Sequence, residues 1–274
     1  MAVLQPAPTP TIDPSNPTIL QWDDLGLSLI YDFITEAEEK AMIDAFHAQD
    51  PLDEGNQKRR ISQHFGYHFD YSTFGASETR FTPVPSYITD FLPRLPVQTY
   101  LPDQFTVQYY PPGSGIPPHV DTHSMFAEAL YSLSFGSAVP MQFRMMGPND
   151  ARKMRLPKRS LQSENAGSGS TSTVPGKQCQ RPDEEQPPTW ELVLPARSLL
   201  LITGPSRYGY THAIRPRKTD VMDGKTVPRQ GRYSITMRTT RRGDEIGCDC
   251  AYPGVCDAMI REEMAAGGTS EVRY

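Results

Sequence analysis

Residues 115–124 read GIPPHVDTHS and place a histidine and an aspartate two positions apart, at His119 and Asp121. In a β-strand, side chains two residues apart point to the same face, so an imidazole and a carboxylate would reach one metal ion. A second histidine would complete the 2-His-1-carboxylate set, which leaves coordination positions open on non-haem iron(II). The sequence therefore predicts a metal-bearing strand here and a third ligand elsewhere in the chain.

The candidate third ligand is His212, which lies in the segment GYTHAI, residues 209–214. A single histidine beside an apolar strand is usually a structural residue. After a His-x-Asp pair in an antiparallel pattern, however, it can return to the same end of a barrel. We therefore expect iron on His119, Asp121 and His212.

The composition is that of a soluble globular protein, with 274 residues, 37% hydrophobic and 22% charged. A formal net charge of −5 provides no global basic field for nucleic acid. No apolar run approaches the ~18–20 residues of a membrane span, and the N-terminus lacks the features of a signal peptide. We expect no membrane partner and a cytoplasmic or nuclear location, where cysteines are metal ligands or free thiols.

Short segments of alternating apolar and polar residues, separated by turn residues, indicate antiparallel strands. The clearest is 104–110, with apolar or aromatic side chains at 105, 107 and 109. Helices are predicted at 35–48, opened by the capping-box pair Thr35 and Glu38, and at 86–92. The fold class is mainly β with flanking helices, a double-stranded β-helix of the jelly-roll or cupin type. The other predicted strands are 25–33, 115–124, 130–135, 141–145, 191–194, 198–203 and 231–241.

The chain divides into a tail and one domain. Residues 1–18 hold five prolines without periodicity and predict a flexible, disordered tail. Residues 19–274 form a single domain, in which 157–189 reads as a disordered insertion that contains an exposed Cys179. Residues 64–71, HFGYHFDY, form an aromatic-rich strand or hairpin. Its aromatic side chains are either core residues or a lid over a planar ligand.

Two arginines lie on one face of the strand at 231–241. Period-two alternation places Arg232, Ser234, Thr236 and Arg238 together. Guanidinium groups inside a barrel need anions, and a small dicarboxylate would satisfy both. The alternative is a solvated strand face with two surface arginines.

Three cysteines fall within the segment CDCAYPGVC, residues 248–256. In a reducing compartment such spacing predicts thiolate ligands for zinc. His123, next to the iron strand but surplus to the iron set, is the candidate fourth ligand beside Cys248, Cys250 and Cys256. The alternative is a disulfide with one spare thiol.

Taken together, four segments resemble the AlkB-type 2-oxoglutarate dioxygenases, most closely their tRNA-hydroxylase branch. They are GIPPHVDTHS (115–124), ARSLLLITGPSRYGYTH (196–212), GRYSITMR (231–238) and CDCAYPGVCD (248–257). The segment HFGYHFDY is also similar to that branch. The resemblance covers about residues 25–258, apart from the insertion.

The resemblance implies a set of site residues. Iron(II) would be held by His119, Asp121 and His212, and zinc by His123, Cys248, Cys250 and Cys256. The cosubstrate 2-oxoglutarate would be bound by Arg232 and Arg238, with help from Tyr110 and Gln108. Gln108 stands where the family usually has Asn. Animal members of the branch also carry RNA-recognition and methyltransferase domains. This chain has no room for them, so tRNA specificity is expected from the catalytic domain, its tails or a separate tRNA methyltransferase.

The leading functional hypothesis is hydroxylation of a modified wobble uridine in tRNA. Basic clusters at 58–60, 152–155, 215–218 and 241–242 flank the expected mouth and would contact the nucleic acid, although such clusters are usually a solvated face. The alternatives are oxidative demethylation of N-alkylated bases in RNA or DNA and, from another class, a metal-stabilised binding module without turnover.

Overall fold

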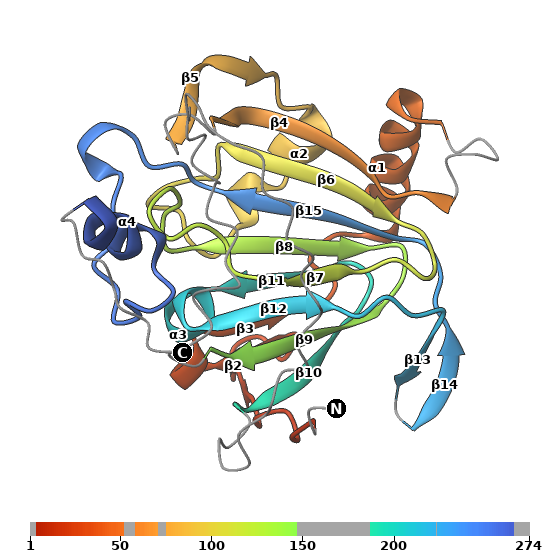
Figure 1. Ribbon diagram of the computed structural model, residues 1–274. Coiled ribbons are helices and arrows are strands. Elements are labelled where there is room, and N and C mark those ends of the chain that lie inside the picture. Colours follow the sequence, from red (N-terminus) through yellow and green to blue (C-terminus); the bar gives the residue numbers. More distant parts are fainter. Residues whose placement is uncertain (1–3, 52–57, 71–74, 147–186, 223, 266–274) are drawn as a thin grey trace, which may run out of the picture.

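The computed structural model describes residues 4–51, 58–70, 75–146, 187–222 and 224–265 (Figure 1). Its helices are α1 (Glu36–Gln49), α2 (Ser86–Thr89), α3 (Gly204–Tyr208) and α4 (Asp257–Ala265), with short 3-10 turns η1 (Asp23–Leu25), η3 (Leu92–Arg94) and η5 (Gly243–Glu245). Its strands are β1 (Thr11–Ile12), β2 (Ile19–Trp22), β3 (Leu27–Ile30), β4 (Ile61–Asp70), β5 (Gly75–Thr82), β6 (Gln104–Tyr110), β7 (Ile116–His119), β8 (Leu130–Phe135), β9 (Val139–Met145), β10 (Thr189–Leu194), β11 (Ser198–Ile202), β12 (Tyr210–Ile214), β13 (Thr219–Met222), β14 (Lys225–Pro228) and β15 (Arg232–Arg238).

Two antiparallel sheets form the body of the molecule. The larger has the strand order β1-β2-β3-β11-β8-β15-β6-β4-β5, and the smaller has the order β10-β9-β12-β7. From β6 onward the chain passes back and forth between the two sheets, so β11, β8, β15 and β6 face the four strands of the smaller sheet. This winding is the double-stranded β-helix, which confirms the predicted fold class.

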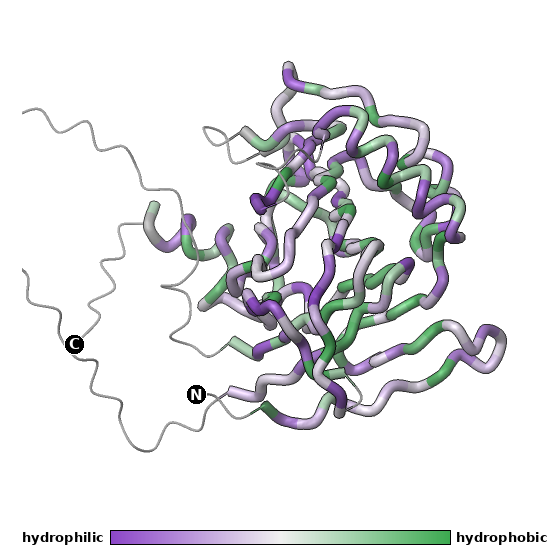
Figure 2. Tube along the Cα trace, turned by 90° about the vertical axis from the view of Figure 1, so that its right-hand side faces the viewer, coloured by the Kyte–Doolittle hydropathy of each residue, from purple (hydrophilic) through white to green (hydrophobic). Residues whose placement is uncertain are grey.

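Alternation along the strands produces two separate cores. One face of β6 and β15, with Phe105, Val107, Tyr233 and Ile235, packs with residues of α1 and α2. The second core lies between the two sheets and is centred on Phe143, which stacks on Trp190 with ring centroids 4.7 Å apart. Figure 2 shows these apolar stretches running through the middle of the molecule. The polar faces of β6 and β15 are thereby turned away from the helices and toward the smaller sheet.

The first predicted helix is confirmed in its start and its length. The Thr35 side chain accepts a hydrogen bond from the Glu38 backbone N–H, and the Glu38 carboxylate accepts one from the Thr35 backbone N–H. This reciprocal pair satisfies donors that a helix start leaves without partners. The second predicted helix is shorter than expected, since α2 ends at Thr89 and a 3-10 turn containing Pro93 follows.

The prediction of a flexible tail over residues 1–18 is wrong for the part that the structure describes. Strand β1 pairs with β2, the Gln5 backbone N–H donates to the Thr189 carbonyl, and the Trp22 indole donates to the Pro8 carbonyl. A segment rich in proline lacks N–H donors, but it still offers carbonyl acceptors and the donors between its prolines. These tie it to the sheet.

Most of the predicted insertion at 157–189 lies outside the described residues, and so does Cys179. Thr189, which the prediction assigned to the insertion, instead begins β10. The hairpin of β13 and β14 was not predicted; Asp220 of β13 forms a buried ion pair with Arg229, which directly follows β14. No described helix has the length and apolar character needed to cross a membrane.

Candidate active site

Two histidines from neighbouring strands of the smaller sheet converge with an aspartate from the loop that follows the first of these strands. His119 ends β7 and stands opposite His212 of β12 in the strand register. Asp121 lies past the end of β7 rather than within a strand, which differs from the expected geometry. The ligand atoms of all three nevertheless lie within 4.8 Å of one another. We call these residues the triad, and their donor set suits one divalent metal ion.

The triad is buried, and its electrostatics favour metal binding. Burial alone would raise the pKa of the Asp121 carboxyl, but Arg238 and the two histidines hold it well below its usual value. Burial lowers the pKa of His212 to about 3, so its imidazole is neutral. The Asp121 carboxylate and the His212 ring stand 3.6 Å apart, from Oδ2 to Nε2. An anionic carboxylate at Asp121 beside a neutral imidazole at His212 is the protonation state that metal ligation requires.

The backbone that carries Asp121 is held by a buried arginine that the sequence analysis missed. Arg207 of α3 is only 2% exposed, and its two terminal nitrogens donate to the carbonyls of Asp121 and Thr122 at 2.9 and 2.7 Å. The signal was an arginine in the otherwise uncharged stretch LLLITGPSRYGYTH. Because residues 121 and 122 lie outside the strands, these bonds satisfy carbonyls that no strand ladder reaches.

A second missed residue holds the other side of the same loop. Asp257, the first residue of α4, accepts hydrogen bonds from the backbone N–H groups of His123 and Ser124 and from the Ser124 hydroxyl. Arg261, one turn further along α4, pairs with the Asp257 carboxylate at 2.7 Å. The loop between β7 and β8 is thus fixed to α3 on one side and to the C-terminal helix on the other.

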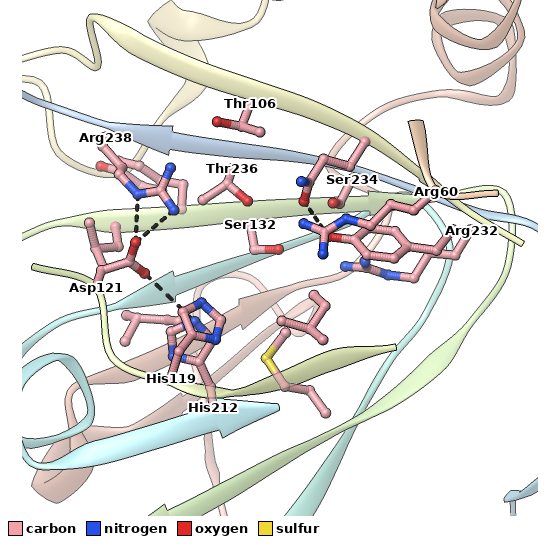
Figure 3. A pocket seen from close by; sticks show the side chains of 17 residues that line it. Arg60, Thr106, His119, Asp121, Ser132, His212, Arg232, Ser234, Thr236 and Arg238 are labelled. Carbon is pink, nitrogen blue, oxygen red and sulfur yellow. Dashed lines mark hydrogen bonds and ion pairs between the residues drawn. The ribbon is translucent and has the colours of Figure 1, made fainter. Parts of the chain in front are cut away.

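The pocket beside the triad is walled by the polar faces of β6 and β15. Figure 3 shows the triad at one end and two arginine side chains at the other, with a row of hydroxyl groups between them. The predicted face of β15 is confirmed, since all four of its members line this pocket: Arg232, Ser234, Thr236 and Arg238. The alternative of two surface arginines on a solvated strand is therefore wrong.

The two arginines of β15 have different surroundings. Arg238 is already paired, and its Nε and a terminal nitrogen lie 2.7 and 2.6 Å from Asp121 Oδ1. Arg232 is fully buried and donates once, to the Ser134 hydroxyl at 2.8 Å. Its Nε and Nη1 are buried without a hydrogen-bond partner among the described residues. Burial lowers the pKa of Arg232 to about 10, so this cation lacks compensation inside the pocket.

Tyr110 and Gln108 are placed next to Arg232. The Tyr110 hydroxyl donates to the Gln108 side-chain oxygen, and the Gln108 amide nitrogen donates to the Ser62 hydroxyl at 3.1 Å. The Arg232 guanidinium lies over the Tyr110 ring, 5.3 Å from its centroid. All the residues predicted for the cosubstrate therefore border one pocket.

Iron and 2-oxoglutarate fit these residues. The triad offers three ligands at one end of the pocket, and an iron ion held by them would keep coordination positions for other groups. The unpartnered nitrogens of Arg232 require anionic acceptors, and a carboxylate can accept from both. A ligand with a carboxylate at one end and metal-binding oxygens at the other matches both ends of the pocket.

A second group of potential ligands lies outside this pocket. His123, Cys248, Cys250 and Cys256 place their ligand atoms within 4.8 Å of one another, and we call them the thiolate cluster. The three cysteines are free thiols, so the alternative of a disulfide is wrong. His123 is fully buried, and its Nδ1 lies 3.6 Å from the Cys250 sulfur.

The chemistry of the thiolate cluster fits a cation. Burial first, and then the neighbouring thiols, raise the pKa of Cys250 to about 12 and raise that of Cys256. A divalent ion would offset this by binding the deprotonated sulfurs. The segment packs closely on α3, since a Cβ at Gly209 would meet the Tyr252 ring at 2.5 Å.

Comparison with known families agrees with this arrangement. The model of the 2OG-Fe(II) oxygenase superfamily matches residues 26–238, which include the whole triad and both arginines of β15. The chain belongs to the 2OG-Fe(II) oxygenase superfamily. It is therefore a 2-oxoglutarate-dependent oxidoreductase that uses iron(II), and the interpretation as a binding module without turnover is set aside.

The relatives of this oxygenase are AlkB-type proteins, which confirms the resemblance. It is 33% identical over 257 residues to "tRNA (carboxymethyluridine(34)-5-O)-methyltransferase alkbh8" of Xenopus tropicalis, covering 85% of this chain and 34% of that protein. It is 32% identical over 244 residues to "Alkylated DNA repair protein ALKBH8 homolog" of Arabidopsis thaliana, covering 85% of this chain and 63% of that one. The chain thus spans about a third of the animal relative and less than two thirds of the plant one.

Among solved structures, the chain is similar to OsALKBH1, with 14% identity and a TM-score of 0.47 over 80% of this chain and 99% of that one.

Proposed function

We propose that this oxygenase hydroxylates a modified uridine at the wobble position of tRNA. The observation that carries the proposal is the similarity to the Xenopus relative, whose name specifies carboxymethyluridine at position 34. That name describes a methyl transfer, whereas the matched part of this chain holds an oxygenase site. An oxidation of the same nucleoside is the reaction that reconciles the two.

In this proposal the triad binds iron(II) and Arg232 anchors the distal carboxylate of 2-oxoglutarate. When bound, iron and cosubstrate supply the oxidation of a C–H bond, coupled to conversion of 2-oxoglutarate to succinate and carbon dioxide. Arg232 fixes the cosubstrate's orientation, with Tyr110 and Gln108 beside it. Arg238 neutralises Asp121 and fixes its carboxylate on the pocket side.

The hairpin of β4 and β5 supports a nucleic-acid substrate, because it extends the wall of the pocket formed by β6. Phe65 is a core residue, but Phe81 is 54% exposed and packs edge-on against Tyr67 at 5.0 Å. The Arg242 guanidinium lies over the Tyr67 ring, 4.1 Å from its centroid. Exposed aromatic rings flanked by arginine are suited to stacking on unpaired bases. The basic residues at 152–155 lie outside the described residues.

The proposal is tested by nucleoside mass spectrometry of bulk tRNA after incubation with the purified protein, iron(II) and 2-oxoglutarate. We expect one modified uridine to gain a single oxygen atom, only when both cofactors are present, and the matched His119→Ala protein to produce none. Unchanged uridine nucleosides, with succinate formed from the cosubstrate, would refute the substrate but leave the oxygenase assignment intact.

Oxidative demethylation of an N-alkylated base is the second candidate, favoured by the name of the Arabidopsis relative. It requires the base to be extruded into the pocket. The same experiment distinguishes the two, since demethylation would deplete methyladenine or methylcytosine and leave the uridine nucleosides unchanged.

We further propose that the thiolate cluster binds zinc as a structural ion. Four protein ligands fill a tetrahedral site, which leaves no position for a substrate. The ion would attach the C-terminal segment to the loop that carries Asp121. Elemental analysis should find one zinc per chain, retained when iron is removed by a mild chelator. We also propose that the protein acts in the cytoplasm or nucleus together with a separate tRNA methyltransferase. Co-purification of a methyltransferase with this protein from cells tests the partnership.

A further inference from the structure

Arg60 belongs to the basic cluster 58–60, which the sequence assigns to nucleic-acid contact, but it also lines the pocket. It directly precedes β4, whose first residue Ile61 pairs with Tyr109 of β6. Its side chain is exposed, yet it lines the pocket at the Arg232 end (Figure 3). Within the described part of the chain its guanidinium has no hydrogen bond or ion pair, and its one specific contact is the Tyr110 ring at 4.9 Å.

The Tyr110 ring thus lies close to two guanidinium groups. Arg232 stands 5.3 Å from the ring centroid and is buried, while Arg60 stands 4.9 Å from it and reaches solvent. Two cations near one ring repel each other, and after burial Arg60 is among the causes that lower the pKa of Arg232. Cation–π contacts of about 0.5–2 kcal/mol each offset only part of this cost.

The pocket provides no anion for this pair. Asp121 is the one carboxylate among the described residues that line it, and it stands at the other end, bonded to Arg238. The Arg232 end therefore has two cationic groups, and two nitrogens of Arg232 lack a partner. A carboxylate offers about four lone-pair sites on two oxygens, enough for donors that approach from two directions.

We propose that Arg60 is a second anchor for the distal carboxylate of 2-oxoglutarate, approaching it from the solvent side while Arg232 holds it from within. Arg60 then selects cosubstrates that carry two carboxylates and shields that carboxylate from water. The inference rests on the assignment of the Arg232 end of the pocket to the cosubstrate, and it adds a residue that determines specificity.

A matched pair of ligands isolates the effect. 2-Oxoglutarate and 2-oxopentanoate share the 2-oxo acid and the chain length, but only the first has a distal carboxylate. Affinities are measured by calorimetry with the manganese(II)-loaded full chain. Arg60→Met should weaken the affinity for 2-oxoglutarate about five- to tenfold, as for loss of one charge-assisted bond at a partly exposed site. The affinity for 2-oxopentanoate should not change. Arg60→Lys should recover part of the loss, because an ammonium keeps the charge without the planar fork.

Arg59→Met is the matched control, since it removes the same charge from the adjacent exposed residue, which does not line the pocket. Equal affinity of wild type and Arg60→Met for 2-oxoglutarate would overturn the inference. So would an effect on tRNA affinity alone, which would assign Arg60 to a phosphate. A wild-type protein that binds no 2-oxoglutarate would instead overturn the cosubstrate assignment itself, so the two failures are distinguishable.

Discussion

The triad and the thiolate cluster both take ligands from the short stretch 119–123 but face different surroundings. His119 and Asp121 border the pocket between the sheets, whereas His123, two residues further on, faces the C-terminal segment. The triad supplies three ligands and adjoins open space, while the thiolate cluster supplies four. Ligand number and the adjoining cavity together decide whether a metal centre reacts or only supports the fold.

The loop at residues 121–124 links the triad to the thiolate cluster through its backbone. Arg207 holds the carbonyls of residues 121 and 122, and Asp257 holds the N–H groups of 123 and 124. Asp257 directly follows Cys256 of the thiolate cluster. A change at the thiolate cluster is therefore expected to reach the triad through α4, although the two sites share no ligand.

The largest expected effect comes from a triad ligand. His119→Ala should reduce succinate formation at least about a hundredfold, because even residues that only support a metal ligand cost ~10–100-fold when changed. Zinc content, measured by elemental analysis, should stay at the wild-type value. Concurrent loss of zinc would show that the two centres are one cooperative unit.

Removing a ligand from the thiolate cluster should act on stability first. Cys250→Ser should abolish zinc binding and lower the melting temperature by roughly 5 °C or more, because metal binding free energy is folding free energy. Cys179→Ser, the same change outside the cluster, is the control and should melt like wild type. A zinc-free Cys250→Ser protein with unchanged melting temperature would mean that the ion does not support the fold.

Substituting Arg207 tests the positioning of the triad without removing a triad ligand. Arg207→Ala should weaken iron(II) binding about 10- to 100-fold, as for other residues that orient a ligand, with the zinc content unchanged. Arg207→Lys keeps the charge but replaces the two terminal nitrogens by one, so it should restore only part of the affinity. Iron titrations followed by turnover give the apparent constant. Equal constants for all three proteins would assign Arg207 to packing alone.

The smallest effect is expected at Asp257. Asp257→Asn keeps an acceptor for the N–H groups of 123 and 124 but loses the charge that pairs with Arg261. We expect about 1–2 kcal/mol of lost unfolding free energy, measured by denaturant titration. Glu262→Gln, an exposed carboxylate on the same helix, is the control. If the free energy of unfolding falls no more than in the control, the attachment of residues 123 and 124 to Asp257 does not depend on its charge.

Much of the fold and the site could be predicted, because strand periodicity is a local property. The alternation in β6 and β15 places Gln108, Tyr110, Arg232 and Arg238 on one face, and the structure keeps them there. The capping pair of Thr35 and Glu38 likewise depends on residues three apart. The prediction of a flexible tail was wrong because amino-acid composition indicates only a local tendency toward disorder. It does not reveal that β2 pairs with β1.

Other features could not be predicted from the sequence because they depend on contacts between distant segments. The uncharged stretch around Arg207 sets this arginine apart, but it does not reveal the partner. The burial of Arg207 follows from the contact between α3 and the loop at 121–122. The same holds for Arg60, whose place beside the pocket depends on the pairing of β4 with β6.

By itself, the sequence determined which residues are candidates for the chemistry and which face of each strand they occupy, since backbone geometry alone sets the two-residue period. Only the tertiary structure decided that Asp121 reaches the histidines from outside a strand, that Arg238 is paired while Arg232 is not, and that Arg60 lies beside the same ring. The reason is that burial and charge compensation are properties of the space between elements, which no single segment of the chain encodes.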